Sequence, residues 1–486
     1  MSPLLAAFLK SCTPEQTFLG HLHDAIERAR AANKHKRPAR HQPMSQVSSR
    51  FTFRPLLLGY NGASNTGADV RVIEMLRQFR HIYAHVAFDP VLLASGADFG
   101  HAEFQHVRKL HMTSYFPDFI EEEMEHTTGI IACEGSMFTS TFSDNLTGMF
   151  AGGIGYATAR GHLGVGYGAE AAAMSPGLEK FVASACDGSL VIARNKDSLI
   201  RLQQLGLRAQ AGADPAWTFE PTGSGALDLL RQAGWNGQDR IAVLCPVNPF
   251  CWPVVIDVAR GRGAASQGTS DEWQRDAISF HSWSAEAAQK YQTYLAGFAE
   301  LIQSLRGRGY FTLLVGMQDI DQPSCLRLNQ RLDAPLPVFV RGPHSIDDIT
   351  GLLHHAALIV TSRFHAALIG MAAGTPCIGV SMDSRITTLF SENGLQDWLL
   401  DCDSTQLGSE LVARASAIEA VSAQLTDQYG MLAAKNIRAF GQMGINLMAE
   451  TTATYPDFPA SPLGASWDAY LPPLSRRVEQ LLSRHA

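Results

Sequence analysis

Short apolar runs alternate with longer segments of helical periodicity through most of the chain. Residues 55–58 form an apolar run, residues 59–67 a Gly-rich turn, and residues 68–80 repeat their hydrophobic side chains on one helical face. Strands that alternate with helices predict a parallel sheet covered on both faces. Similar apolar runs follow in the same half of the chain at 129–133, 165–167 and 190–193.

A second series of the same kind begins near residue 240. Its predicted helices include 284–305, 347–355 and 364–373. Its predicted strands are the apolar runs at 241–245, 310–315, 338–340, 358–361 and 377–380. The two series together predict an α/β protein with two doubly wound, Rossmann-like domains.

The remaining segments set the expected domain limits. Residues 1–53 are expected to hold one or two helices and a linker, and a polar, Gly-rich stretch from Trp252 to Trp283 is expected to be a long inserted loop. After about residue 396 the pattern is helical again, and a closing helix that crosses back to the first domain would suit this architecture. The expected parts are 1–53, a first domain 54–225, a second domain 226–400 and a C-terminal helical segment 401–486.

Composition and charge narrow the possible partners. The 486 residues are 46% hydrophobic and 17% charged, with a formal net charge of -7, so no basic field exists for nucleic acid. The scattered cysteines, without CxxC spacing, predict free thiols, and no cluster suggests a metal. No apolar run approaches the ~20 residues of a membrane span. The expected location is cytoplasmic, with membrane contact only through a lipid-linked substrate.

Ligands of open α/β sheets bind beyond the carboxyl ends of the strands, so the residues after each predicted strand are the candidate site. Near the C-terminal part of the second series, Arg363 and His365 should lie at a helix N-terminus, where backbone N–H groups favour an anion and Ser362 can cap the helix. A structural ion pair for Arg363 and ordinary burial for His365 explain the same spacing equally well. The other candidates selected by this rule are Asn65, Asp69, Glu134, Ser136 and Arg194.

The Gly-rich segment GYNGASNTG, residues 59–67, is neither a Walker A loop nor GxGxxG. A turn that needs a flexible backbone accounts for its glycines. Its polar side chains are the added feature, because Asn65 and the nearby Asp69 are placed where a sugar hydroxyl or a pyrophosphate can be held.

Several segments, in this order, resemble the polysaccharide pyruvyl transferase family. They are GYNGASNTGAD, IIACEGSMF, GYGAEAAAMSPG, VIARNKDSLIRLQQLG, ADPAW and LIVTSRFHAALIGMAAGTPCIGVSMD. The resemblance covers roughly residues 54–400. It implies a fold similar to that of GT-B glycosyltransferases, an acceptor side in the first domain and a donor side in the second.

The same resemblance implies a reaction and residue roles. Members of the family transfer a pyruvyl group from phosphoenolpyruvate onto two hydroxyls of a sugar as a cyclic ketal, without a cofactor, and release phosphate. Arg363 and His365 fall on the family's donor-site R-x-H, and Arg194 falls on its other donor-site arginine. By this reading the arginines hold the anionic groups and His365 handles a proton. Asp69 or Glu134 would accept the proton of the attacking hydroxyl.

Two other functions remain open. A GT-B glycosyltransferase with a nucleotide-sugar donor shares the architecture, but Asp383 and Glu392 do not have the spacing of an acidic pair on one helix face. An inactive binding protein of the same fold is the third possibility. Ala68, where the family usually has an acid, and the inserted stretch at 252–283 are departures that concern the acceptor side.

Overall fold

The computed structural model describes residues 1–35, 51–267 and 273–485. The expected linker lies mostly at 36–50, outside the described residues, as do 268–272 of the inserted stretch. Two helices, α1 (Pro3–Phe8) and α2 (Pro14–His35), precede residue 36.

Within the described residues, the first sheet has seven parallel strands in the order β5-β4-β2-β6-β7-β8-β9. This order places the first strand of the fold in the middle, with later strands added outward on both sides, which defines a doubly wound sheet. The strands are β2 (Pro55–Asn61), β4 (Val91–Ala94), β5 (Arg108–His111), β6 (Gly129–Ala132), β7 (Leu163–Ala169), β8 (Leu190–Ala193) and β9 (Arg208–Ala211). The accompanying helices are α3 (Thr66–Ile82), α4 (Phe116–Glu123), α5 (Asp144–Ala159), α6 (Pro176–Ala185) and α7 (Lys196–Gln204).

The second sheet has six parallel strands in the order β14-β13-β10-β15-β16-β17 within the same described ranges. The winding is again outward in both directions from its first strand. The strands are β10 (Ile241–Cys245), β13 (Phe311–Gly316), β14 (Val338–Val340), β15 (Leu358–Thr361), β16 (Cys377–Ser381) and β17 (Leu399–Asp401). The helices are α8 (Gly225–Gln232), α10 (Ala285–Gly307), α11 (Gln322–Asn329), α12 (Ile346–His354), α13 (Phe364–Ala373), α14 (Ser384–Ser391) and α15 (Leu407–Ala417).

The central strands of both sheets are fully buried, with side chains such as Leu57 and Val243 inaccessible to solvent. Burial on both faces explains why these strands read as continuous apolar runs instead of alternating ones. The strands β1 (Thr52–Phe53) and β3 (Ala87–Phe88) form a separate small parallel pair.

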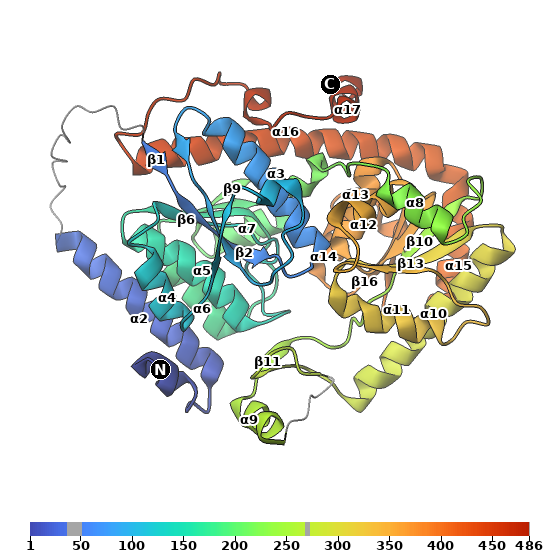
Figure 1. Cartoon of the computed structure of the whole chain (residues 1–486), viewed down its shortest axis with the longest axis horizontal. Helices are drawn as coiled ribbons and strands as arrows, with labels where there is room; N and C mark the ends of the chain where they lie inside the picture. The colour runs from blue at the N-terminus through green and yellow to red at the C-terminus, as the bar shows by residue number, and fades with distance from the viewer. Residues whose placement is uncertain (36–50, 268–272, 486) are drawn as a thin grey trace.

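The C-terminal segment ties the two halves together. Helix α16 (Ser422–Thr454) runs along both domains (Figure 1) and packs against α3 of the first and α13 of the second. This is the crossing helix expected from the sequence, and α17 (Arg476–Arg484) ends the chain. None of the described helices is both long and apolar enough to cross a membrane.

The stretch from Trp252 to Trp283 is not simply a loop. It contains an antiparallel pair, β11 (Val254–Ile256) with β12 (Ser279–His281), and a helix, α9 (Val258–Gln267). The prediction was wrong here because Gly261 and Gly263 suggested a coil. Gly261 instead allows the helix to pack closely against its neighbours, since an added Cβ would lie 2.2 Å from the carbonyl oxygen of Ala277.

Candidate functional site

The topology places the predicted segments at equivalent points of the two sheets. In each sheet the winding direction changes beside the first strand, between β2 and β6 and between β10 and β15. Ligands of doubly wound folds bind at the carboxyl ends of strands next to such a point. The Gly-rich turn follows β2, Glu134 follows β6, and Arg363 follows β15. These candidates therefore lie at the two switch points, whereas Arg194 follows β8, two strands away from β6.

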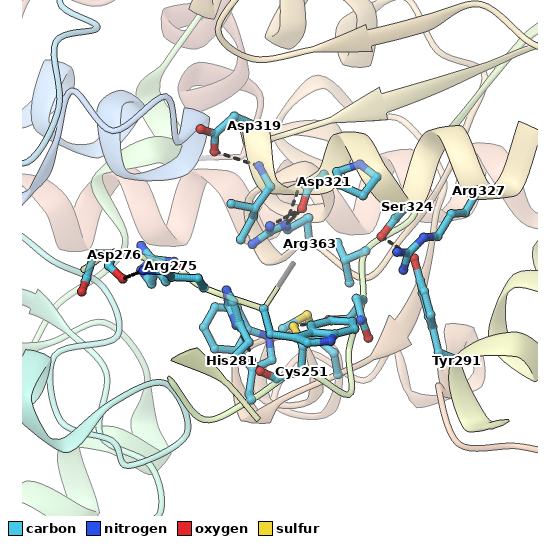
Figure 2. Close-up of a pocket in the computed structure, with 18 of the residues that line it drawn as sticks. Cys251, Arg275, Asp276, His281, Tyr291, Asp319, Asp321, Ser324, Arg327 and Arg363 are labelled. Carbon is cyan, nitrogen blue, oxygen red and sulfur yellow. Dashed lines mark hydrogen bonds and ion pairs between the residues drawn. The ribbon is translucent and has the colours of Figure 1, made fainter. Parts of the chain in front are cut away.

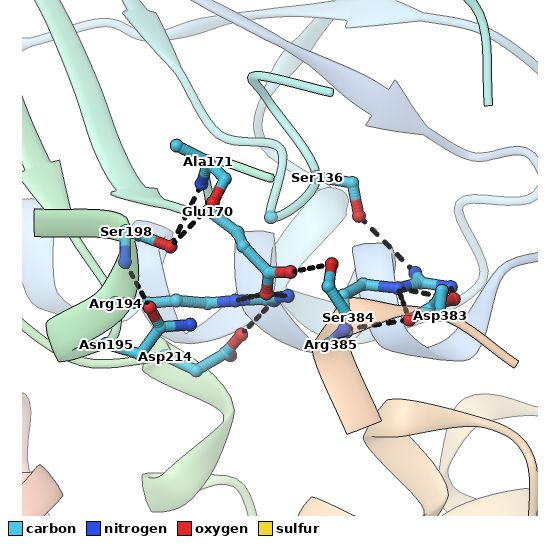
Figure 3. A network of polar contacts seen from close by, with 12 residues as sticks. Ser136, Glu170, Ala171, Arg194, Asn195, Ser198, Asp214, Asp383, Ser384 and Arg385 are labelled. Carbon is cyan, nitrogen blue, oxygen red and sulfur yellow. Dashed lines mark hydrogen bonds and ion pairs between the residues drawn. The ribbon is translucent and has the colours of Figure 1, made fainter. Parts of the chain in front are cut away.

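Arg194 lies in a buried polar network at the end of β8 (Figure 3). Its Nε is 2.9 Å from Oε2 of Glu170, and its Nη1 is 3.0 Å from Oδ2 of Asp214. Arg71 from α3 donates to the same Asp214 oxygen at 2.5 Å. All four side chains are almost inaccessible to solvent. Each charge is therefore matched by an opposite one, as burial requires.

His365 reaches the same network from the second domain. Its Nε2 lies 3.4 Å from Oδ2 of Asp214, and its ring packs on Gly67, where an added Cβ would be 2.0 Å from Nδ1. Burial would raise the pKa of Asp214, but the charges of Arg71 and Arg194 and a hydrogen bond from His365 hold it well below its usual range. Burial lowers the pKa of His365 in spite of the nearby carboxylate. The imidazole is therefore neutral near pH 7, beside a carboxylate that stabilises its protonated form.

Arg363 points away from this network, toward a neighbouring cavity of about 570 Å³ (Figure 2). Its Nε lies 3.1 and 3.0 Å from the two carboxylate oxygens of Asp321, and Nη2 also contacts Asp321. Across the described ranges, Nη1 of Arg363 has no hydrogen-bond partner. The three candidate residues thus converge only in part: Arg194 and His365 share Asp214, whereas Arg363 lines the adjacent cavity.

Phe364 contacts both Arg194 and His365. Its ring lies under the guanidinium of Arg194, with Cζ 4.2 Å from the ring centroid, and it meets the His365 ring edge-on at 4.9 Å. A guanidinium over an aromatic face is stabilised by the ring quadrupole. The segment 363–365 therefore contacts the first domain through two of its three side chains.

Asn65 and Asp69 on α3 make structural contacts. Asn65 caps α3 by accepting from the N–H of Ala68, and its Nδ2 donates to Oε1 of Gln318 at 2.9 Å, which links the domains. Asp69 is fully buried and lies 3.4 Å from Nη2 of Arg341, also across the interface. Burial raises the pKa of Asp69 to about 7, although Arg341 opposes the shift. Both residues therefore join the domains at the Gly-rich turn.

The other three candidates differ in accessibility. Glu134 is half-buried and accepts from the N–H of Gly135. Ser136 is buried and accepts from Nη1 of Arg385 at 3.4 Å, an arginine of the second domain (Figure 3). Ser362 is 1% exposed, and its hydroxyl pairs with that of Tyr294 at 2.9 Å.

The expected capping of α13 by Ser362 is wrong. The N-cap position is occupied by Arg363, and no side chain caps the helix. The reason is that the buried Tyr294 hydroxyl engages the serine inside the second domain.

Several residues of the site were not selected from the sequence. Glu170 directly follows β7, so the strand-end rule applied to that strand would have found it. Asp214 and Asp321 follow β9 and β13 at some distance, and Arg71 lies within a helix, where no local pattern marks it. Ser384 bridges the domains by donating to Glu170 at 3.1 Å. In the described part of the chain no group of three or more His, Cys, Asp or Glu side chains is placed to hold a metal ion.

Comparison with solved structures supports the fold. The S. aureus MnaA-UDP co-structure is similar, with a TM-score of 0.52 and 10% identity over 85% of this chain and 100% of that chain. A glycosyltransferase from Rickettsia africae ESF-5 has a TM-score of 0.49 and 9% identity over 84% of this chain and 99% of its own. The likeness to the first of these structures, at 10% identity, shows the fold alone, which is GT-B-like, as expected.

Sequence comparison gives the family. No curated protein matches the chain. The profile of the family described as polysaccharide pyruvyl transferase matches residues 69–384, more than half of the chain, a span that includes the buried Arg194 network and the 363–365 segment. By this match, and with the two facing sheets, the chain belongs to the polysaccharide pyruvyl transferase family.

Proposed function

We propose that the protein transfers a pyruvyl group from phosphoenolpyruvate to two hydroxyls of a sugar or of a lipid-linked glycan, forming a ketal and releasing phosphate. The observation that carries the proposal is the interdomain contact of His365 with Asp214, beside Arg194 and adjacent to Arg363. Because the donor is a cytoplasmic metabolite, we propose a cytoplasmic reaction.

The cations of the site suit a donor with a phosphate and a carboxylate. Asp321 occupies Nε and Nη2 of Arg363, which leaves the Nη1 donors for an anion. Arg194 is engaged by Glu170 and Asp214 in the described structure, so a donor that binds it must replace one of those contacts. The backbone N–H groups at the start of α13 add to the attraction.

The proton balance assigns a role to His365. In the reaction, one hydroxyl adds to C2 of the donor while C3 gains a proton; the bond from C2 to the phosphate oxygen then breaks, and the second hydroxyl adds to C2. One hydroxyl proton ends on C3 and the other on the released phosphate. A neutral imidazole can take the first proton and pass it on, and Asp214 stabilises the imidazolium between the two transfers.

The glycosyltransferase alternative is weaker in this structure. Asp383 caps α14 and pairs with Arg385 at 2.5 Å, while Glu392 accepts from the N–H groups of Lys196 and Asp197. Both acids are thus used in structural contacts and do not form an acidic pair available to a nucleotide sugar.

The direct test is turnover. Purified protein is incubated with phosphoenolpyruvate and a panel of sugars, nucleotide sugars and lipid-linked sugars, and released phosphate is measured together with the pyruvyl ketal on the acceptor by mass spectrometry. We expect His365→Ala to abolish release without changing the melting temperature. The exposed His355 provides the control, since His355→Ala should behave as wild type. Turnover by His365→Ala would exclude the assigned role, and release from a nucleotide-sugar donor instead would favour the alternative.

A further inference from the structure

The cavity beside Arg363 has one wall that the second sheet does not supply. That wall is residues 251–267 and 273–283, here called the insertion wall, which contribute Trp252, Trp273, Arg275 and His281 to the cavity. The rest of the lining includes Tyr60 of the first domain and residues after β10, β13 and β15. The cavity is therefore lined by both domains and by the insertion.

The insertion wall follows β10 of the second domain in the sequence, but hydrogen bonds attach it to the first part of the chain. The N–H of Val254 donates to the carbonyl of Phe142 at 2.8 Å, and the N–H of Ile256 donates to Oε1 of Glu15 at 3.0 Å. Arg262 adds a bond to the carbonyl of Leu9 at 3.2 Å. Glu15 and Leu9 belong to the N-terminal helical region, so that region positions one wall of the cavity.

The chemistry of the cavity is aromatic and polar together. Trp273 stacks on Trp283, with ring centroids 4.1 Å apart and planes at 18°, and Trp252 meets His281 edge-on at 5.0 Å. Arg275 donates to the Tyr60 hydroxyl and lies 5.3 Å from the centroid of its ring. Flat rings fit the C–H faces of a sugar ring, and carboxylates and guanidiniums between them fit its hydroxyls.

Apart from Nη1 of Arg363, which is proposed for the anion of the donor, the charge of the cavity argues against an anionic occupant. Burial lowers the pKa of His281, so this ring is neutral. The arginines of the lining are matched by as many aspartates: Arg275, Arg327 and Arg363 against Asp276, Asp319 and Asp321. A binding site for a diphosphate normally carries an excess of cationic groups.

From the attachment, the rings and the charge balance, we propose that this cavity binds an uncharged pyranose residue of the acceptor and that the insertion wall selects it. The assignment rests on the proposed function for its biological meaning, because the bound sugar would present its hydroxyls beside Arg363. Arg275 and Trp273 are the specificity-determining residues.

The binding test omits phosphoenolpyruvate. Methyl glycosides of glucose, galactose, mannose and N-acetylglucosamine are titrated by saturation-transfer NMR, with UDP and inorganic phosphate as charged comparisons. We expect at least one glycoside to bind and Trp273→Ala and Arg275→Gln to weaken it about tenfold or more. Matched controls are the half-buried Trp235→Ala and Arg306→Gln, which lie outside the cavity and should bind as wild type.

A second measurement separates loss of sugar binding from loss of folding. The thermal shift caused by phosphoenolpyruvate should be the same in wild type and in both variants, which shows that the donor side is intact. If a variant does not fold, hydrogen exchange on the wild type replaces it, and a glycoside must then protect peptides of the insertion wall.

The proposal is overturned if no glycoside binds, if the variants bind as wild type, if the insertion wall gains no protection, or if UDP or phosphate binds there in preference. Glycoside binding without any turnover of phosphoenolpyruvate would instead remove the proposed function and leave this site standing.

Discussion

The substitution Gly67→Ala is expected to displace the ring of His365 while leaving the residue itself unchanged. Gly67 is the second residue of α3, where alanine is ordinarily tolerated and in a helix interior is favoured by about 1 kcal/mol. The added Cβ, however, would lie 2.0 Å from Nδ1 and 2.5 Å from Cγ of His365, whereas ordinary contact begins at 3.4 Å. The ring, or the helix that carries it, must therefore shift by more than an ångström.

A shift of that size removes the contact with Asp214, which is already long at 3.4 Å. Misplacing a catalytic group by about 1 Å costs on the order of a hundredfold in rate. We therefore expect kcat/KM for phosphate release to fall about a hundredfold, equivalent to about 2.7 kcal/mol of transition-state stabilisation. Because this loss concerns the transition state of the reaction and not the folded state, the melting temperature should change little.

Gly177 offers a matched control. It is the second residue of α6, and an added Cβ meets nothing within 4 Å. Gly177→Ala should keep full activity. Wild-type activity in Gly67→Ala, or an equal loss in Gly177→Ala, would refute the assigned geometry.

Two further predictions concern the interface. Because the folded state raises the pKa of Asp69 to about 7, this group favours folding at low pH, and that contribution is lost as pH rises from about 4 through about 7. Asp69→Asn should therefore gain stability over wild type between about pH 5 and about pH 8, by up to about 4 kcal/mol in denaturant unfolding. A difference in unfolding free energy between variant and wild type that does not change with pH would contradict this prediction. Arg194→Met should lower the unfolding free energy by about 3 kcal/mol by leaving Glu170 without its partner, and adding Glu170→Gln should restore part of it. A loss below about 1 kcal/mol, or no recovery, would count against the network.

Much of the fold could be predicted because buried parallel strands are continuous apolar runs. β10 and β15 are such strands, and both were located almost to the residue. The edge strands β5 and β9 were missed because they read RKLH and RAQA. An edge strand is paired on one side only, so it tolerates polar side chains and loses the hydrophobic signal.

The site was predictable only where a strand end marks it. Arg363 and His365 were found because they follow β15, but the spacing does not show that their side chains leave in different directions. That difference depends on partners from distant parts of the chain, Asp321 for one and Asp214 for the other. Ion pairs between residues so far apart in sequence leave no local pattern.

The attachment of the insertion wall has a consequence for how substrates enter. Helix α16 joins the domains along one edge of the molecule, and β11 and α9 span them along the other (Figure 1). Simple hinge opening is therefore restrained at both edges. Wide separation requires the N–H of Val254 to leave Phe142 and that of Ile256 to leave Glu15. Exchange of the proposed glycan acceptor would then depend on how often this small sheet detaches, so the N-terminal helices would influence turnover without touching either substrate.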